Sequence, residues 1–233
     1  MEMETGVVAK RYGQLESERD TFLERGREAA KLTIPTLLPE EGHSSSSIYP
    51  TPYQGIGARG VNNLASKLLL ALLPPNSPFF RLTIDDFDLQ AIAGDNRGQV
   101  EEGLARIERA AMAEIESKAI RVTACEALKL LIVTGNSLVY MNKEGGMKVF
   151  RPDRYVCKRD TMGNLIEVIT KESLNVLNLP DSVKEMMPPS DSPVKNYDLY
   201  TKVCLVEKGW EVYQEVAGIE VPESRGMFKK DQN

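Results

Sequence analysis

Histidine and cysteine are the scarcest chemically reactive residues in this chain. Its 233 residues include one histidine, His43, and three cysteines, Cys125, Cys157 and Cys204. None of the four has the close paired spacing of structural zinc ligands, so we expect no metal site. A serine or cysteine nucleophile usually needs a histidine base, and His43 lies in a serine-rich stretch typical of a loop. We therefore predict no enzyme activity and no cofactor, and we expect reduced cysteines packed as small apolar residues.

Long apolar runs and an excess of positive charge are also missing. The longest apolar run, Leu68–Leu73, is far shorter than the roughly 20 residues that span a bilayer, so we expect no membrane association. Lys and Arg total 29 against 34 Asp and Glu, a net charge of -5 that disfavours a surface gripping nucleic-acid phosphates. With 42% apolar and 27% charged residues, the composition is typical of a folded chain of one large or two small domains.

Apolar periodicity predicts helices through the first 135 residues. Val8, Leu15, Phe22 and Ala29 recur every seven residues and predict one long helix over 7–31. Further helices are predicted over 54–73, 100–118 and 122–134, with a short strand at 79–84. The 122–134 segment is apolar almost all round, so we expect it to be the buried helix of the domain.

After Gly135 the pattern changes to strands and turns. Three hairpins are predicted, which pair residues 137–142 with 147–150, 154–159 with 165–171, and 197–207 with 210–216. One or two short helices are predicted over 174–187, between the second and third hairpins. The chain is therefore expected to have an α+β fold, with long amphipathic helices followed by an antiparallel β meander. We place the helical part at 1–135 and the β-hairpin part at 136–233, with the 122–134 helix packed against the sheet.

A glycine-rich loop and an acidic cluster each allow two interpretations. Gly55–Gly60 spells G-x-G-x-x-G at the start of a helix, where a dinucleotide phosphate could bind. A Rossmann motif needs a strand before the first glycine, whereas 49–54 is proline-rich, so we favour close helix packing as the role of the glycines. The cluster Asp85, Asp86 and Asp88 could bind a divalent cation, but helix capping explains it as well and is preferred.

The segment 50–68, PTPYQGIGARGVNNLASKL, resembles the signature segment of portal (head-tail connector) proteins of short-tailed, podovirus-type bacteriophages. Similar segments follow the family in the same order at Thr33–Pro39, Arg121–Thr123, Arg159–Asn164 and Asp198–Thr201. The resemblance implies a structural virion protein, with twelve copies forming a ring at one capsid vertex through which double-stranded DNA is packed and ejected.

The resemblance also implies partners and a place for this chain within the ring subunit. The expected partners are terminase, the scaffolding and major capsid proteins and a tail adaptor protein, in the virion and, during assembly, in the host cytoplasm. The chain would form the peripheral wing. The channel-lining stem, clip and crown of the family lie beyond its length, so we expect the 233 residues alone to form rings weakly or not at all.

Rings are built from head-to-tail contacts, so one face of a subunit must fit a different face of its neighbour. The charged sides of the 7–31 and 100–118 helices are candidates for such faces. We select Arg59, Asn62, Asn63 and Lys67, on the polar arc of the 54–73 helix, as candidate anchors within or between subunits. The alternatives are a nucleotide-binding module or enzyme that uses the Gly55–Gly60 loop, and a monomeric virion adaptor.

Overall fold

A computed structural model of the protein describes residues 6–43, 46–75, 77–84, 96–143, 145–179, 181–184 and 196–229. The chain divides into two compact units: one combines Met1–Gly26 with Phe150–Asn233, and the other is Arg27–Val149. The units do not separate at Gly135, because the N-terminal segment joins the C-terminal strands. The α+β fold class is confirmed, with long helices in the first part of the chain and antiparallel strands in the rest.

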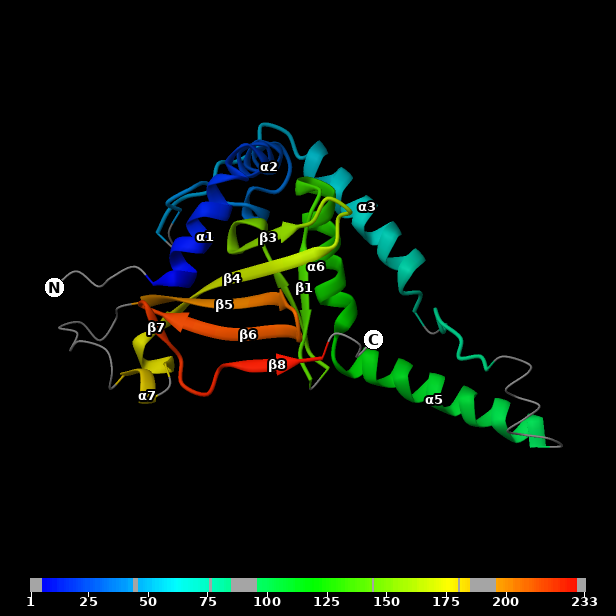
Figure 1. Cartoon of the computed structure of the whole chain (residues 1–233). Helices are drawn as coiled ribbons and strands as arrows, with labels where there is room; N and C mark the ends of the chain where they lie inside the picture. The colour runs from blue at the N-terminus through cyan, green and yellow to red at the C-terminus, as the bar shows by residue number, and fades with distance from the viewer. Residues whose placement is uncertain are drawn as a thin grey trace. The chain divides into compact units, whose positions relative to one another are not determined.

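An antiparallel sheet forms most of the first unit (Figure 1). Its strands pair in the order β3-β4-β5-β6-β7, and β8 also pairs with β6. The two hairpins predicted here are confirmed, while β7 and β8 extend the sheet beyond the prediction. The elements are α1 Val7–Ser17, η3 Pro152–Arg154, β3 Tyr155–Arg159, β4 Leu165–Asn175, η4 Val176–Asn178, α7 Asp181–Lys184, β5 Asn196–Val206, β6 Gly209–Val216, β7 Ile219–Glu220 and β8 Gly226–Phe228.

Helix α1 packs on this sheet through one apolar face. Val8, Tyr12 and Leu15 are spaced at i, i+4 and i+7, which places them on the same side of the helix, and all three are buried. They form a core cluster with Val156 of β3 and Ile169 of β4. The first unit therefore buries one core cluster between a helix and strands that lie more than 130 residues apart in the sequence, and a second cluster forms around Val183 and Val216.

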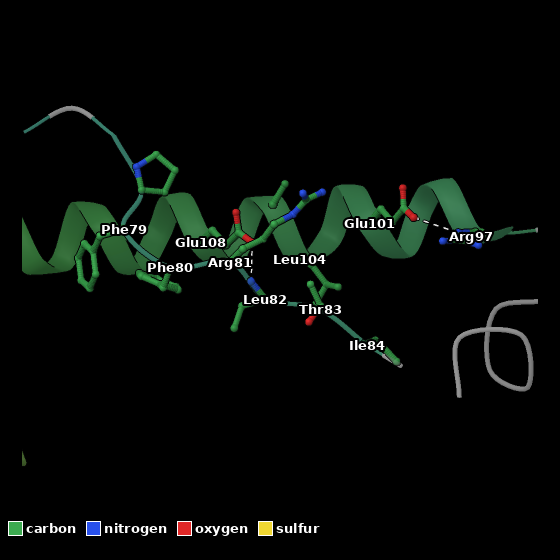
Figure 2. Close-up of a pocket in the computed structure, with 12 residues that line it drawn as sticks. Phe79, Phe80, Arg81, Leu82, Thr83, Ile84, Arg97, Glu101, Leu104 and Glu108 are labelled. Atoms are coloured by element: carbon green, nitrogen blue, oxygen red, sulfur yellow. Dashed lines mark hydrogen bonds and ion pairs between the residues drawn. The ribbon is translucent and has the colours of Figure 1, made fainter. Parts of the chain in front are cut away.

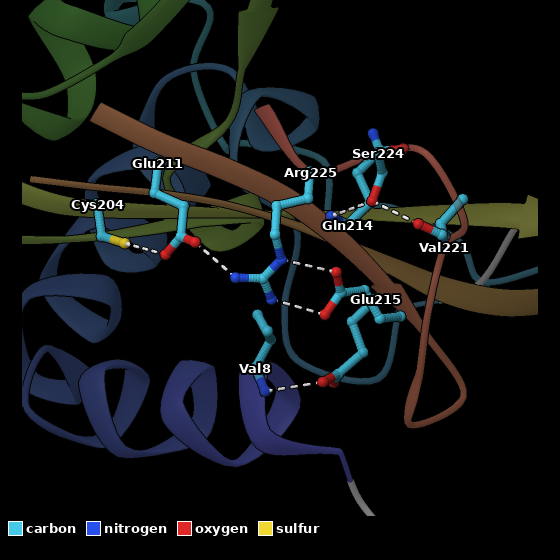
Figure 3. Close-up of polar contacts among 9 residues, drawn as sticks. Val8, Cys204, Glu211, Gln214, Glu215, Val221, Ser224 and Arg225 are labelled. Atoms are coloured by element: carbon cyan, nitrogen blue, oxygen red, sulfur yellow. Dashed lines mark hydrogen bonds and ion pairs between the residues drawn. The ribbon is translucent and has the colours of Figure 1, made fainter. Parts of the chain in front are cut away.

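Two buried carboxylates fix α1 to the sheet. Glu215 of β6 accepts hydrogen bonds from the backbone N–H groups of residues 8 and 9, both at 3.0 Å, and so satisfies free donors at the helix N-terminus (Figure 3). Glu167 of β4 accepts hydrogen bonds from Arg11 Nε at 3.0 Å and Nη2 at 2.9 Å, and it pairs with Lys202 of β5 at 3.1 Å. Burial acts to raise the pKa of Glu167, but the hydrogen bonds from Arg11 and Lys202 outweigh it and hold that pKa below its usual value.

Helices dominate the described residues of the second unit. Helices α3 and α5 each pack against α6, and the predicted β1-β2 hairpin follows α6. Gly135 ends α6 in the left-handed region, with φ 76°, and its N–H donates to the Leu131 carbonyl at 2.9 Å. No helix in the described ranges has the length and apolarity needed to cross a membrane. The elements are η1 Pro35–Leu37, α3 Ile56–Leu72, α5 Arg97–Ser117, α6 Ile120–Thr134, β1 Leu138–Met141 and β2 Met147–Phe150.

The single helix predicted over 7–31 is wrong, because the chain forms α1 and a separate α2 (Asp20–Leu32). Between them the Arg19 N–H donates to the Glu16 carbonyl at 2.9 Å, an i to i-3 bond that is tighter than an α-helical turn. This turn resets the helical phase. In α2 the buried apolar side chains are therefore Leu23 and Ala30, each one residue after the predicted Phe22 and Ala29.

Two further predictions for the second unit are wrong. Residues 79–84 form no strand and run irregularly beside α5, where the Leu82 N–H donates to a Glu108 carboxylate oxygen at 2.7 Å instead of to a neighbouring strand. The α6 helix is not the buried helix of the domain: Leu130 and Thr134 are buried, but Val122 is 71% exposed. Within its own unit, α6 contacts mainly α3.

Two further predictions concern the cysteines and the acidic cluster at 85–88. Cys125, Cys157 and Cys204 are free and partly buried, as predicted. Asp85, Asp86 and Asp88 lie outside the described residues, so the preference for helix capping stays a prediction.

Candidate subunit-contact surface

Helix α3 has one buried face and one open face. Val61 and Ala65 are buried and lie one turn apart, on the side that packs against α6. The helix ends at Leu72, and Pro74 follows shortly after, which is typical because proline cannot continue a helix. The predicted span of 54–73 is therefore confirmed to within two residues at each end.

The four predicted contact residues all lie on the open side of α3. Arg59, Asn62, Asn63 and Lys67 are exposed, and none of them makes a hydrogen bond or ion pair with a residue in the described part of the chain. They are thus not anchors within the described molecule. Their side chains remain available to a partner, and a contact between subunits stays a prediction.

The glycine loop does not have the geometry of a dinucleotide site. Gly55 is the N-cap of α3, and the preceding residues 50–54 are irregular, with no strand to present the loop. A Cβ at Gly57 would lie 2.5 Å from the Leu32 carbonyl oxygen, so Gly57 is needed for close packing of α3 against the chain at that point. Gly55 and Gly60 have open space around the Cβ position, and nothing in their surroundings requires glycine.

Arg121 holds the C-terminal end of α3 in place, a role that the sequence did not reveal. Its guanidinium donates to the carbonyl oxygens of Leu73 and Pro74, the latter at 2.9 Å, and its Nε donates to Glu116 at 2.9 Å. The last carbonyls of a helix lack partners within the helix, so a cation placed there satisfies them. The only signal in the sequence was that Arg121 opens one of the segments that resemble the portal family.

Helix α5 is the most open element of the second unit. Its predicted apolar stripe is present, but none of its 21 residues is buried, and Ile107 is 56% exposed. Its acidic side chains are mostly paired locally: Glu101 with Arg97 at 3.0 Å and Glu102 with Arg106 at 2.8 Å. The stripe, which in a compact domain would face the core, is only partly covered by the described residues: Leu104 lies against residues 78–84, whereas Ile107 is open.

A groove of about 960 Å³ runs between α5 and the irregular residues 78–84 (Figure 2). Phe79, Phe80 and Leu82 line one side of the groove, and Leu104 lines the other together with two carboxylates, Glu101 and Glu108. Arg81 and Arg97 also line the groove, and Arg97 pairs with Glu101 at 3.0 Å, so the lining combines apolar side chains with balanced charges.

Comparison with known proteins gives one consistent family. A family model described as bacteriophage head to tail connecting protein matches residues 5–230. The portal protein of Escherichia phage T7 is 38% identical over 232 residues, which cover 94% of this chain and 43% of that protein. The portal protein of Enterobacteria phage T3 is 38% identical over 231 residues, with the same coverage, and that of Enterobacteria phage SP6 is 31% identical over 234 residues, covering 96% of this chain and 45% of that protein. The chain thus spans less than half the length of these relatives.

Proposed function

The chain belongs to the bacteriophage head to tail connecting protein family, and from this premise we propose that it is part of a portal ring at the unique vertex of a capsid. The observation that carries the proposal is the match over residues 5–230, nearly the whole chain, supported by portal proteins at 31–38% identity. We propose a structural role in genome packaging, genome ejection and head-tail connection, with no catalytic reaction of its own.

The role within the ring is that of a peripheral wing. We propose that the helical part, 1–135, and the β-hairpin part, 136–233, both belong to the wing, and that twelve copies surround the double-stranded DNA. Terminase, the scaffolding and major capsid proteins and a tail adaptor protein are the proposed partners. The acidic balance of the chain, net charge -5, supports a conduit that lets DNA slide rather than one that grips it.

The open face of α3 is the proposed place of contact between subunits. Arg59, Asn62, Asn63 and Lys67 are exposed there and are not engaged by the described residues. A ring interface needs such side chains on its surface, because polar groups that are already satisfied within a subunit contribute little to a partner.

Substitution of the two cations tests this assignment. The Arg59→Ala, Lys67→Ala double variant of the full gene product that carries this chain is expected to lower the fraction of rings seen by negative-stain electron microscopy. The matched control is Arg25→Ala with Lys158→Ala, which removes two exposed cations outside α3. Equal ring fractions in the two double variants and the unchanged protein would refute the assignment.

A further inference from the structure

Residues 77–84 and helix α5 lie beside each other and bury little against the other described residues of the second unit. The two line the groove of Figure 2, and the Leu82 N–H donates to Glu108 of α5 at 2.7 Å. None of the 21 residues of α5 is buried. Among the described helices and strands, α5 packs mainly against α6. We call residues 77–84 together with α5 the arm.

The corner between the arm and α6 is a single residue in the left-handed region. Helix α5 ends at Ser117, with Lys118 as its C-cap, and α6 begins at Ile120. Ala119 between them has φ 51° and ψ 32°. A Cβ atom makes this conformation unfavourable, so glycine usually takes it. Residues held in such conformations cluster at switch regions, because the surrounding structure has to enforce them.

One arginine at the start of α6 holds both connections of the arm. Arg121 donates to the carbonyl oxygens of Leu73 and Pro74, which come just before residues 77–84; the second bond measures 2.9 Å. The same guanidinium donates from Nε to Glu116, in the last turn of α5, at 2.9 Å. Because both connections meet at this guanidinium, its contacts fix the direction in which the arm leaves the unit.

We propose that the arm is hinged: it turns as one body about Ala119, and Arg121 is the latch that holds it in the observed direction. A hinge motion needs a stiff body and a few terminal residues that absorb the change in backbone angles. The long helix with residues 77–84 beside it is the stiff body, and its lack of buried side chains makes the motion inexpensive. Water can replace the latch, because Glu116 is half exposed.

The hinge gives the subunit a part whose direction changes while the rest of the second unit keeps its structure. The proposal concerns a single chain and does not depend on ring formation. Gln99, near the far end of α5, is 20 residues from Ala119, which is about 30 Å along a helix. A turn of about 10° about Ala119 therefore moves Gln99 by about 5 Å.

Distances between pairs of spin labels, measured by pulsed electron paramagnetic resonance, test the hinge. The corner pair, Gln99→Cys with Glu126→Cys, spans the junction of α5 with α6. The arm pair, Thr83→Cys with Ala110→Cys, lies within the arm, and all four positions are exposed. The full gene product that carries this chain is labelled with its native cysteines replaced by serine. It is diluted into unlabelled protein, so that only distances within one chain are measured.

Arg121→Met should broaden the distance distribution of the corner pair by about 5 Å or more and leave that of the arm pair unchanged. The matched control is Arg109→Met, which removes an exposed arginine of α5 that has no hydrogen bond or ion pair with a described residue, and it should change neither distribution. A corner distribution that Arg121→Met leaves unchanged would overturn the proposal. Equal broadening of both pairs would overturn it too, because the arm would then lose its structure instead of turning.

Discussion

Arg121 offers the sharpest test of how the second unit holds α3 in position. The proposed change is Arg121→Met, which keeps most of the aliphatic side chain and removes the guanidinium. In the structure this guanidinium donates to the Leu73 and Pro74 carbonyls and pairs with Glu116, and its side chain is only 19% exposed. The variant therefore loses the link between the end of α3 and the junction of α5 with α6.

The expected cost follows from these contacts. Each hydrogen bond between a charged donor and a carbonyl contributes about 1.5–3 kcal/mol net, and water recovers part of this because the two carbonyls are only partly buried. The ion pair with Glu116 adds less than about 1 kcal/mol, because that glutamate is half exposed. The sum is about 2–4 kcal/mol, which corresponds to a loss of local protection of roughly 30-fold to 1,000-fold.

Hydrogen exchange followed by mass spectrometry is the assay, because it reports on α3 separately from the sheet. Peptides covering α3 should lose protection by at least about 30-fold in Arg121→Met, while peptides from β4 and β5 serve as the internal reference. The matched control is Arg109→Met, because Arg109 is exposed on α5 and has no hydrogen bond or ion pair with a described residue. If Arg121→Met exchanges like Arg109→Met, the proposed role of Arg121 is wrong.

Two further predictions concern packing and pH. Gly57→Ala should destabilise the protein by about 1–3 kcal/mol, because its Cβ would meet the Leu32 carbonyl oxygen at 2.5 Å. Gly60→Ala should instead stabilise α3 by about 0.5–1 kcal/mol, because the space around its Cβ position is open. Urea unfolding of both variants measures the difference in stability, and equal effects would contradict the packing role of Gly57. The pKa of Glu167 is lowered in the folded state, so its contribution to stability is complete above about pH 4.5 and is lost as the pH falls through the folded pKa. Unfolding followed from pH 7 to pH 3 should show a shallower acid loss in Glu167→Gln than in the unchanged protein, and parallel curves would count against the Arg11–Glu167–Lys202 cluster.

The sequence predicted the parts of the fold that depend on local patterns. The apolar spacing of α3 and α5 gave both helices nearly at their observed bounds, and the turn residues gave the hairpins of the sheet. These features follow from a period of 3.6 or 2 residues and from local turn chemistry, so neighbours in the sequence are sufficient to specify them.

The errors arose where distant residues decide the structure. The break between α1 and α2 depends on a single tight turn at Arg19, and no proline or glycine marks it. The carboxylate that holds the start of α1, Glu215, lies 207 residues away from Val8, so no local pattern could indicate the contact. The exposed stripe of α5 was read correctly as apolar, but periodicity cannot tell whether the surface that covers it belongs to the same chain or to another.

The predicted contact residues show the same limit. The polar arc of α3 was identified because Arg59 and Lys67 lie opposite the buried positions Val61 and Ala65, and the structure places them on the open side. The role of Arg121 was missed because the carbonyls that it contacts are 47 and 48 residues earlier in the chain. Contacts over such separations require the folded arrangement.

Ring formation tests the central claim most directly. Negative-stain electron microscopy of the full gene product that carries this chain shows whether rings form, and native mass spectrometry counts their subunits. Neither measurement needs a partner protein. The proposed portal role predicts closed rings with a central hole and twelve copies. A protein that stays folded and monomeric at all concentrations would contradict that role and would favour a monomeric virion adaptor.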